Sequence, residues 1–471
     1  MAFLYLFPVL IVAIFAYLLQ IYLSKQKPIS RNTIPWANQP QQKKVPDADY
    51  SKILPPSQRH VLPKLIPAAQ SHVVNLSTLD KSLLKLGSDY RSASPSTSVY
   101  SGFTVGDVRA LGTFPNYAVL SGVPAPTPLR NFDIDAARPR PYRPFRWPYH
   151  QTMSIYLIPA YKKLDPDYWL ELESTYRERI AQRRDLYEKH GKDILQALPG
   201  SELACKELME MALQFLAARY PQQFEIRDNV FVNHILNTTH DLAVGEPLHI
   251  LLHNVPEDFG ITMRDEKTGR YHLRAGMICS SLGWKLGQKI GMGLQGVHQE
   301  VPSYKEKMAF SMDRFFTKMA APSPIQRGSW GLEIGQPLFL PTDHPDWSNR
   351  DSQKESLREE DIYLRVDWQT LRRLPLSGAI IFNFKALYTP ILEFADEPYI
   401  PSLVLKILNE GEAGIMKYKS TWHVEHIAKP ALQRYEKMQL EEGLIEKDWA
   451  VQTLDESPFF PGWERKHPIS L

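Results

Sequence analysis

Cysteine is nearly absent from this sequence: Cys205 and Cys279 are the two cysteines among 471 residues. Two cysteines cannot build a disulfide framework, and their scarcity agrees with a reducing compartment. The chain also lacks C-x-x-C, G-x-S-x-G and P-loop motifs, which excludes an iron–sulfur, hydrolase or phosphate-binding signature of its own. A net charge of +3 is too small to indicate nucleic-acid binding. With 43% hydrophobic and 23% charged residues, the composition is that of a globular protein.

Charge is missing from residues 3–23, an apolar run with one strongly polar side chain, Gln20. At ~1.5 Å per residue, a helix of this length is roughly 31 Å long and can cross a hydrocarbon core. The run is longer than the apolar region of a signal peptide and lacks a basic start, which favours a single transmembrane anchor. Lys25, Lys27 and Arg31 follow it, so we expect the C-terminal part to be cytoplasmic, at the endoplasmic reticulum membrane.

Composition divides the chain into three parts. The anchor occupies residues 1–24. Residues 25–128 are rich in proline and serine and carry little periodic apolar sequence, so we expect a mostly disordered spacer whose removal leaves the rest folded. Within it, the apolar piece Tyr117–Leu120 is expected to dock on the domain that follows. Residues 129–471 form that globular domain.

Apolar periodicity in the domain predicts both helices and strands. Repeats at three- and four-residue steps predict helices that begin at Asp165-Pro166, Ser201 and Ser303, and two more near residues 402–408 and 424–440. Short apolar runs predict strands at residues 230–232, 250–252, 261–263, 271–273, 362–366 and 379–384. Helices segregated from a run of strands predict an α+β domain with an antiparallel sheet.

A glycine-rich segment precedes a histidine loop. Residues 291–296 match G-x-G-x-x-G, but the segment before them is a poor buried strand and Pro302 follows too soon for a helix, so we do not predict a dinucleotide site. Glycines also let a backbone approach a flat ligand closely. His298, on the stiff loop that ends at Pro302, could ligate a heme iron. From spacing alone, an ordinary loop histidine is the better interpretation.

Two further pairs of histidines have the spacing of metal ligands. They are His249 with His253, and His423 with His426. Either pair could share a face and bind a metal. Neither matches H-E-x-x-H and no third ligand is evident nearby, so structural or surface roles are the better interpretation.

An ordered series of segments resembles a known family. The segments are Met153, residues 163–165, 176–184, 198–201, 284–291, 298–304, 313–316, Gln326-Arg327 with Trp330, and 369–375 leading into 378–382. In this order they resemble the α subunit of the heme-dependent oxidative N-demethylases, in the branch common in fungi. The resemblance covers residues 143 to 420.

The resemblance implies a fold and an activity. The fold would be PAS-like, with a curved antiparallel sheet that holds heme b against added helices. The activity would be oxygen-dependent removal of a methyl group from a secondary alkylamine, with release of formaldehyde. Electrons would come from NADPH through a separate flavin and iron–sulfur reductase component, which agrees with the absence of those signatures here. The alternative is a heme-binding sensor or scaffold module without catalytic turnover.

The resemblance also assigns residues to roles. His298 becomes the first choice for the iron ligand. Candidates for polarising oxygen on the open face, by motif membership, are Tyr304, Gln369 and Arg373. Lys285 and Lys289 could pair with heme propionates, and a solvated basic edge explains them equally well. The sequence departs from the family pattern at Ser303, where glycine is expected, and at Gly328-Ser329, where an asparagine is expected before Trp330.

Overall fold

The computed structural model describes residues 83–147 and 162–467. The expected anchor and the first part of the expected spacer lie outside these residues. Within the described ranges, no helix combines the length and the apolar character needed to cross a membrane.

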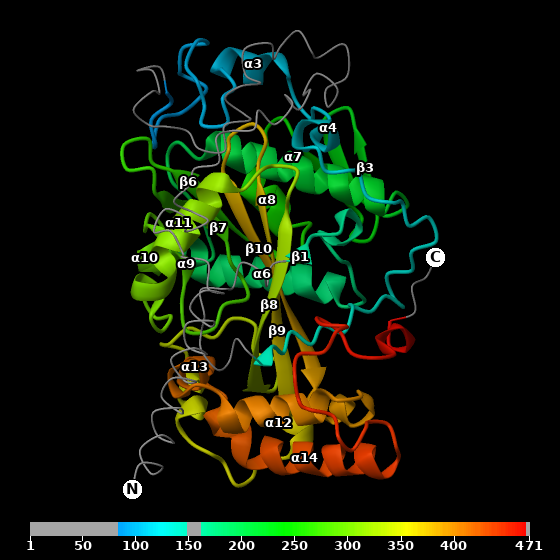
Figure 1. Ribbon diagram of the computed structural model, residues 1–471. Helices are drawn as coiled ribbons and strands as arrows, with labels where there is room; N and C mark the ends of the chain where they lie inside the picture. Colours follow the sequence, from blue (N-terminus) through cyan, green and yellow to red (C-terminus); the bar gives the residue numbers. More distant parts are fainter. Residues whose placement is uncertain (1–82, 148–161, 468–471) are drawn as a thin grey trace, which may run out of the picture. The chain divides into compact units, whose positions relative to one another are not determined.

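Among the described residues, an antiparallel sheet of seven strands organises the domain (Figure 1). In spatial order the strands are β1 (Lys162–Lys163), β8 (Ile325–Ile334), β9 (Ile362–Arg373), β10 (Ile380–Pro390), β6 (Asp258–Arg264), β7 (Tyr271–Met277) and β2 (Leu195–Ala197). β6 and β7 contain the strands predicted at residues 261–263 and 271–273 and form a hairpin, with Gly269 in its turn at a φ of +70°. The expectation of an α+β domain with an antiparallel sheet is confirmed.

The pairing register sorts the side chains of this sheet onto two faces. Directly paired residues point to the same side of a sheet. Arg327, Gln369 and Phe384 are paired across β8, β9 and β10, so they share one face, called the first face below. Trp368 and Lys385 are also paired and belong to the second face.

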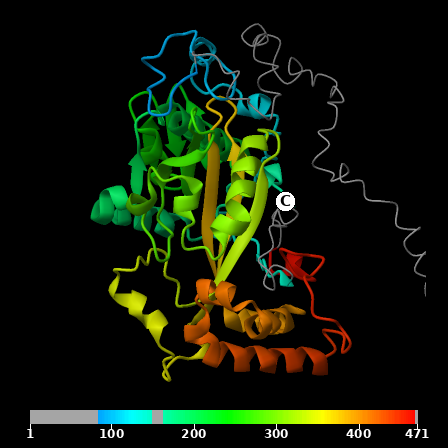
Figure 2. The ribbon, with the colours of Figure 1, turned by 60° about the vertical axis from the view of Figure 1, so that its left-hand side comes forward.

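The second face carries two hydrophobic cores. Helices lie at both ends of the long strands (Figure 2). Near β6 and β7 the second face packs against α6 (Tyr176–His190), α7 (Glu202–Arg219) and α8 (Pro247–Leu252). A small sheet of β3 (Phe224–Arg227), β4 (Val230–Asn233) and β5 (Thr238–Asp241) adjoins these helices. At the far end of the long strands it packs against α12 (Ile400–Glu410) and α14 (Trp422–Glu441). The helices predicted from Ser201 and near residues 402–408 and 424–440 are confirmed.

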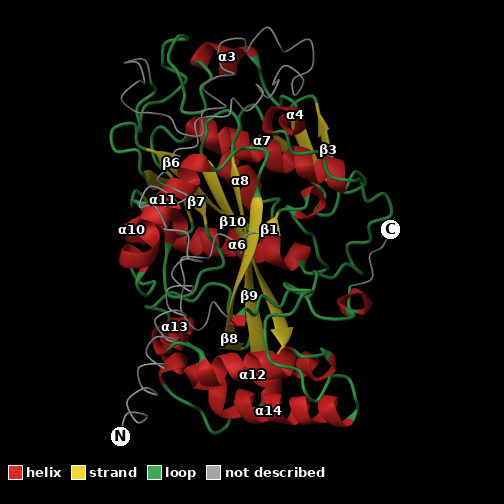
Figure 3. Cartoon of the chain, in the orientation of Figure 1, coloured by secondary structure: helices red, strands yellow, loops and turns green. Residues whose placement is uncertain are grey.

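Short helices between β7 and β8 cover the first face (Figure 3). They are α9 (Leu286–Lys289), α10 (Leu294–Val297), the π-helical turn η6 (Tyr304–Met308) and α11 (Ala309–Lys318). Leu294 of α10 and Phe316 of α11 belong to one buried cluster with Leu371 of β9. Ser303 does not cap this helix as predicted; its φ is +53° and its side chain makes no capping hydrogen bond.

The remaining elements are short. They are α3 (Val105–Ala110), α4 (Tyr117–Ser121), η4 (Pro166–Tyr168), η5 (Gly191–Asp193), η7 (Pro345–Asp351), η8 (Glu359–Asp361), η9 (Ile391–Asp396), α13 (Ala413–Lys419) and η10 (Trp463–Arg465).

Residues 83–128 are packed structure, so the expectation of a disordered spacer does not hold for this part. Thr104 and Asp107 form a reciprocal capping box at the start of α3. Val105 is 0% exposed and Tyr117 is 3% exposed, and both belong to the core around α7. The Tyr117 hydroxyl donates a hydrogen bond to Glu210 Oε2 at 2.6 Å. The docking of Tyr117–Leu120 is as expected, because α4 begins there.

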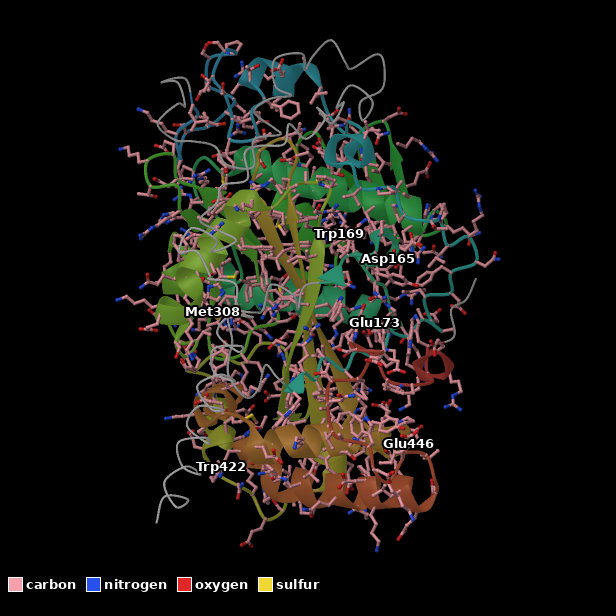
Figure 4. The ribbon with its side chains drawn as sticks, viewed as in Figure 1. Asp165, Trp169, Glu173, Met308, Trp422 and Glu446 are labelled. Carbon is pink, nitrogen blue, oxygen red and sulfur yellow. The ribbon has the colours of Figure 1, made fainter. Side chains whose placement is uncertain are left out.

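The helix predicted from Asp165 is much shorter than its apolar repeat suggests. Asp165 caps η4, which ends after three residues, and α6 begins only at Tyr176. Between them, the N–H groups of Glu171 and Leu172 donate to the Glu257 carboxylate and the Tyr220 hydroxyl, each at 3.2 Å. Because both amides donate to distant side chains, they do not form the backbone hydrogen bonds of a continuous helix. Figure 4 labels Asp165, Trp169 and Glu173 along this segment.

The run at residues 250–252, predicted as a strand, is the end of α8. Pro247 occupies the first turn of that helix, where its missing N–H costs nothing. Leu248, Ile250, Leu251 and Leu252 are all buried. A short helix that is apolar nearly all round has the same sequence pattern as a buried strand.

Candidate functional site

The segment from Gly291 to Gly293 is held against the edge of β7. The Gly291 N–H donates to the Leu273 carbonyl at 2.7 Å, and the Leu273 N–H donates to the Met292 carbonyl at 2.9 Å. Gly291 has a φ of +83°, a conformation that favours glycine. The glycine motif follows helix α9 and precedes a four-residue helix, which is not the strand–helix context of a dinucleotide site. The glycines instead position α10 and the loop that follows it, which contains His298.

His298 follows α10, and a hydrogen bond to that helix fixes its imidazole. His298 Nδ1 lies 2.8 Å from the Leu294 carbonyl oxygen. Because a carbonyl oxygen can only accept, Nδ1 carries the proton and Nε2 keeps its lone pair. The Tyr304 ring stacks on the imidazole, with centroids 4.6 Å apart and planes 9° from parallel. Metal-ligating histidines have this tautomer and this kind of support.

Burial keeps the His298 imidazole neutral. Loss of solvent lowers the pKa of His298 to about 4, and the positive charges of Lys289 and Arg327 act in the same direction. The Leu294 hydrogen bond opposes this shift without overcoming it. At neutral pH the ring therefore offers the unprotonated nitrogen that iron requires.

Lys289, one of the two lysines predicted beside the cofactor, borders this loop. Its Nζ donates to the Val297 carbonyl at 2.9 Å, one residue before His298. The same ammonium lies 4.8 Å from the centroid of the Trp284 ring. Burial lowers the pKa of Lys289. Lys289 is thus a partly desolvated cation next to the candidate iron ligand.

Lys285, the second predicted lysine, is engaged elsewhere. Its Nζ lies 2.6 Å from Asp343 Oδ2 and 3.7 Å from Asp193 Oδ2. The hydrogen bond to Asp343 is the main reason why the pKa of Lys285 is raised. This paired ammonium fits the solvated basic edge that the sequence left open.

Tyr304 and Arg373, two of the predicted catalytic residues, have different surroundings. Tyr304 opens η6 and packs with Ile415 of α13 and with Met308, which Figure 4 labels, while its ring faces His298. Tyr304 is therefore brought to the candidate ligand. The Arg373 guanidinium donates to four oxygens, those of Met319 and Gly378 at 2.6 Å, the Tyr271 hydroxyl at 3.0 Å and the Phe316 carbonyl. These bonds make Arg373 a clamp between β9 and α11.

Gln369, the third predicted catalytic residue, lies on the first face of the sheet. It is directly opposite Arg327 in the β8–β9 ladder. Its Oε1 is buried and has no hydrogen-bond partner among the described residues. Gln369 thus supplies a polar group that the described structure does not satisfy.

Two further cations were not predicted as site residues: Arg327, whose charge acts on His298, and Lys419, which lies near Arg327. Arg327 of β8 acts electrostatically on His298. Lys419 of α13 donates from Nζ to the Trp330 carbonyl at 2.9 Å and lies close enough to Arg327 to be repelled by it. Arg327 lies in a segment that carries the family resemblance, and this resemblance could have marked it as a candidate site residue. Nothing local in the sequence points to Lys419.

The other histidines have structural surroundings. His249 Nε2 lies 2.8 Å from the Tyr187 hydroxyl, and His253 stacks on His240 at 5.9 Å. His426 Nε2 lies 3.0 Å from the Lys354 carbonyl. In the part of the chain that is described, no group of three or more histidine, cysteine or acidic side chains could hold a metal ion.

The sheet and the short helices that cover it define a domain of the α+β class, which carries a neutral imidazole at His298. The family described as "Haem-dependent oxidative N-demethylase, alpha subunit-like" matches residues 160–429, more than half of the chain. The chain belongs to this family. The family description indicates a heme cofactor and N-demethylase-like oxidative chemistry, and an α subunit implies a partner subunit or reductase.

The residues present around His298 fit a heme. An axial ligand must be neutral and hold a ring nitrogen lone pair, and the Leu294 hydrogen bond together with burial gives His298 both properties. A flat apolar macrocycle needs an apolar wall. Leu294 and Val297 of α10 pack with Phe382, which lies on the first face of the sheet.

Proposed function

We propose that this chain is a membrane-tethered, heme-dependent oxidative N-demethylase-like oxidoreductase that acts on a secondary alkylamine. It would use heme b, O2 and electrons from a separate flavin and iron–sulfur reductase component. The observation that carries the proposal is the His298 imidazole, whose Nδ1–H is committed to Leu294 while Nε2 keeps its lone pair. The order of the long strands along the sheet, with β10 placed between β9 and β6, supports the PAS-like arrangement expected for the family.

The chain's own residues would prepare the site for that chemistry. When bound, the heme supplies the oxygen-dependent redox chemistry that removes the methyl group. The Leu294 carbonyl holds the Nδ1 proton and so makes Nε2 a better electron donor. The stacked Tyr304 ring fixes the plane of the imidazole. The apolar residues of α10 and of the first sheet face exclude water, which strengthens every electrostatic interaction inside the site.

The test is a comparison of heme spectra among histidine variants of the full chain. His298→Ala removes the only nitrogen donor at this position, so it should abolish or severely weaken the Soret band while the fold survives. The matched controls are His249→Ala and His253→Ala, whose surroundings are structural, and both should keep the parent spectrum. A normal Soret band in His298→Ala, with the loss of the band in a control, would overturn the ligand assignment. A parent that stays colourless with ample heme would refute the proposed function.

A second candidate function is a heme-binding sensor or scaffold without turnover. The observation that favours it is the commitment of Arg373 to four oxygens, because that cation is then not available to polarise oxygen. Amine-dependent consumption of NADPH in the presence of a reductase, with formaldehyde released, separates the enzyme from the sensor. Heme binding without such consumption would favour the sensor.

The proposed topology places the domain in the cytoplasm, at the endoplasmic reticulum. Its support is the apolar run at residues 3–23 followed by basic Lys25, Lys27 and Arg31. Asn75 and Asn237 are in glycosylation acceptor sequences that this orientation leaves unused. Sugar found on either asparagine of the native protein would contradict the cytoplasmic orientation.

A further inference from the structure

A cluster of positive charge surrounds Arg327 at the edge of β8, next to the His298 loop. Among the described residues, β1 pairs with β8 at Ile325 and Gln326, next to Arg327 in the sequence. Arg327 acts on His298, on Arg146 and on Lys419, and in all three cases its charge disfavours the protonated form of the neighbour. Cations brought together at a partly buried edge repel one another and need an anion for balance.

Carboxylates that could balance this charge are scarce. Among the described residues, the Arg327 guanidinium takes part in no hydrogen bond or ion pair. Asp367 acts on Lys419, but its Oδ1 already accepts from Arg365 Nε at 3.0 Å and Nη2 at 2.8 Å. The sequence of residues 148–161, which leads into β1, contains no aspartate or glutamate.

Polar groups near Arg327 also have fewer hydrogen-bond partners than they can use. Burial, followed by the charge of Arg327, lowers the pKa of Lys419 to about 7. Its Nζ donates to the Trp330 carbonyl, and an ammonium has two further donors to offer. Gln369 lies opposite Arg327 in the ladder, yet its Oε1 is buried without a partner among the described residues. Lys419 Nζ also lies 4.4 Å from the centroid of the Trp330 ring. Arg327 thus shares the first face of the sheet with Gln369, and its charge acts on the nearby Lys419.

We propose that Arg327 and Lys419 bind a carboxylate group, which in the heme-loaded protein is a propionate of the heme. This inference rests on the proposed function, and it replaces Lys285 as a propionate partner. A guanidinium fork matches the two oxygens of a carboxylate, and such charge-assisted pairs are the strong ones. Arg327 is near enough to His298 for its charge to act on the imidazole, so a heme held by His298 brings its carboxylates to this region. The propionate would offset the repulsion among the cations.

Heme titration of the full chain, followed at the Soret band, tests the proposal. Arg327→Gln should weaken heme affinity about tenfold or more, the effect of one lost hydrogen bond to a charged group. Lys419→Gln should weaken it less, and Arg327→Lys should recover part of the loss. Lys285→Gln is the matched control, because that lysine is paired with Asp343, and it should bind heme as the parent does. Thermal unfolding of each variant shows whether it is folded.

Heme dimethyl ester, in which both propionates are esterified, tests the source of the carboxylate. If Arg327 pairs with a propionate, the ester should bind the parent about as weakly as heme binds Arg327→Gln. The ester should then bind Arg327→Gln with little further loss, because the two changes remove the same interaction. If the losses of affinity caused by esterification and by Arg327→Gln are additive, the propionate assignment is overturned. Unchanged heme affinity in folded Arg327→Gln would overturn it as well.

N-methylglycine, a secondary amine with a carboxylate, tests the other source of the same chemistry. If Arg327→Gln binds heme normally but no longer binds N-methylglycine by calorimetry, the propionate assignment fails and the carboxylate site belongs to a substrate. If the parent shows no Soret band, the proposed function fails, and calorimetry alone decides on the carboxylate site. A parent that binds neither heme nor N-methylglycine would overturn the inference itself.

Discussion

Tyr117 tests whether the segment before residue 129 is part of the folded domain. Its side chain is 3% exposed and packs in the core around α7, and its hydroxyl donates to Glu210 Oε2 at 2.6 Å. Removal of a buried aromatic side chain costs about 3–5 kcal/mol, a large part of the 5–15 kcal/mol that stabilises an ordinary domain. We therefore expect Tyr117→Ala to destabilise the protein by about 3–5 kcal/mol. Tyr117→Phe keeps the ring and loses only the hydrogen bond, at a cost of about 1.5 kcal/mol, because Glu210 keeps its ion pair with Lys206 at 2.6 Å.

Urea unfolding of the full chain measures both variants against the parent. Phe310→Ala is the control, because Phe310 is 79% exposed and its removal should change the free energy of unfolding by less than about 0.5 kcal/mol. The order of destabilisation should be alanine at Tyr117, then phenylalanine at Tyr117, then the control. If Tyr117→Ala has a free energy of unfolding within about 1 kcal/mol of the parent's, residues 83–128 are peripheral to the fold and act as a spacer.

Three further perturbations have outcomes that the geometry fixes. Arg143 and Glu397 form a buried pair with two contacts of 2.7 Å, and Lys466 Nζ lies 2.8 Å from Glu397 Oε1, so the carboxylate stays partly paired when Arg143 is lost. Arg143→Gln should therefore cost about 1.5–3 kcal/mol in urea unfolding. Arg177→Gln, which breaks an exposed pair, should cost under about 1 kcal/mol, and equal costs would refute the reasoning. Ser303 has a φ of +53°, so Ser303→Gly should stabilise the fold by up to about 1 kcal/mol, and a destabilised variant would contradict the strain. Burial raises the pKa of Glu207 to about 7 from 4.5, so the folded protein holds a proton there that the unfolded chain releases. The free energy of unfolding of the parent, relative to that of Glu207→Gln, should therefore fall as pH rises from about 4.5 through 7. A difference that does not change with pH would exclude the raised pKa.

Local periodicity was enough for elements whose hydrogen bonds stay within the element. The helix α7 after Ser201 and the β6–β7 hairpin are of this kind; the helix and the two strands of the hairpin were predicted. The helix expected from Asp165 was not, because the amides of Glu171 and Leu172 bond to side chains far along the chain. Residues 83–128 were missed for a similar reason. Proline and serine content does not reveal that scattered apolar residues meet a distant helix.

Residues of the candidate site could be proposed from the sequence only where the family resemblance covered them. His298 was chosen from the family segment, and the structure adds why it suits iron, through the carbonyl of Leu294 four residues earlier. Arg327 and Lys419 are separated by about ninety residues, so no local pattern could bring them together. The left-handed backbone of Ser303 agrees with the glycine that the resemblance leads us to expect there.

The long strands of the sheet have a consequence for how the domain moves. β9 and β10 are paired without interruption over eleven residue pairs, and they extend from the core around α7 to the core around α12 and α14. Such a ladder resists bending, because bending would break several neighbouring hydrogen bonds. The amides at its centre should therefore exchange with solvent only when the whole domain unfolds. Flexibility that lets a ligand enter must then come from the covering side, where α9 and α10 have four residues each.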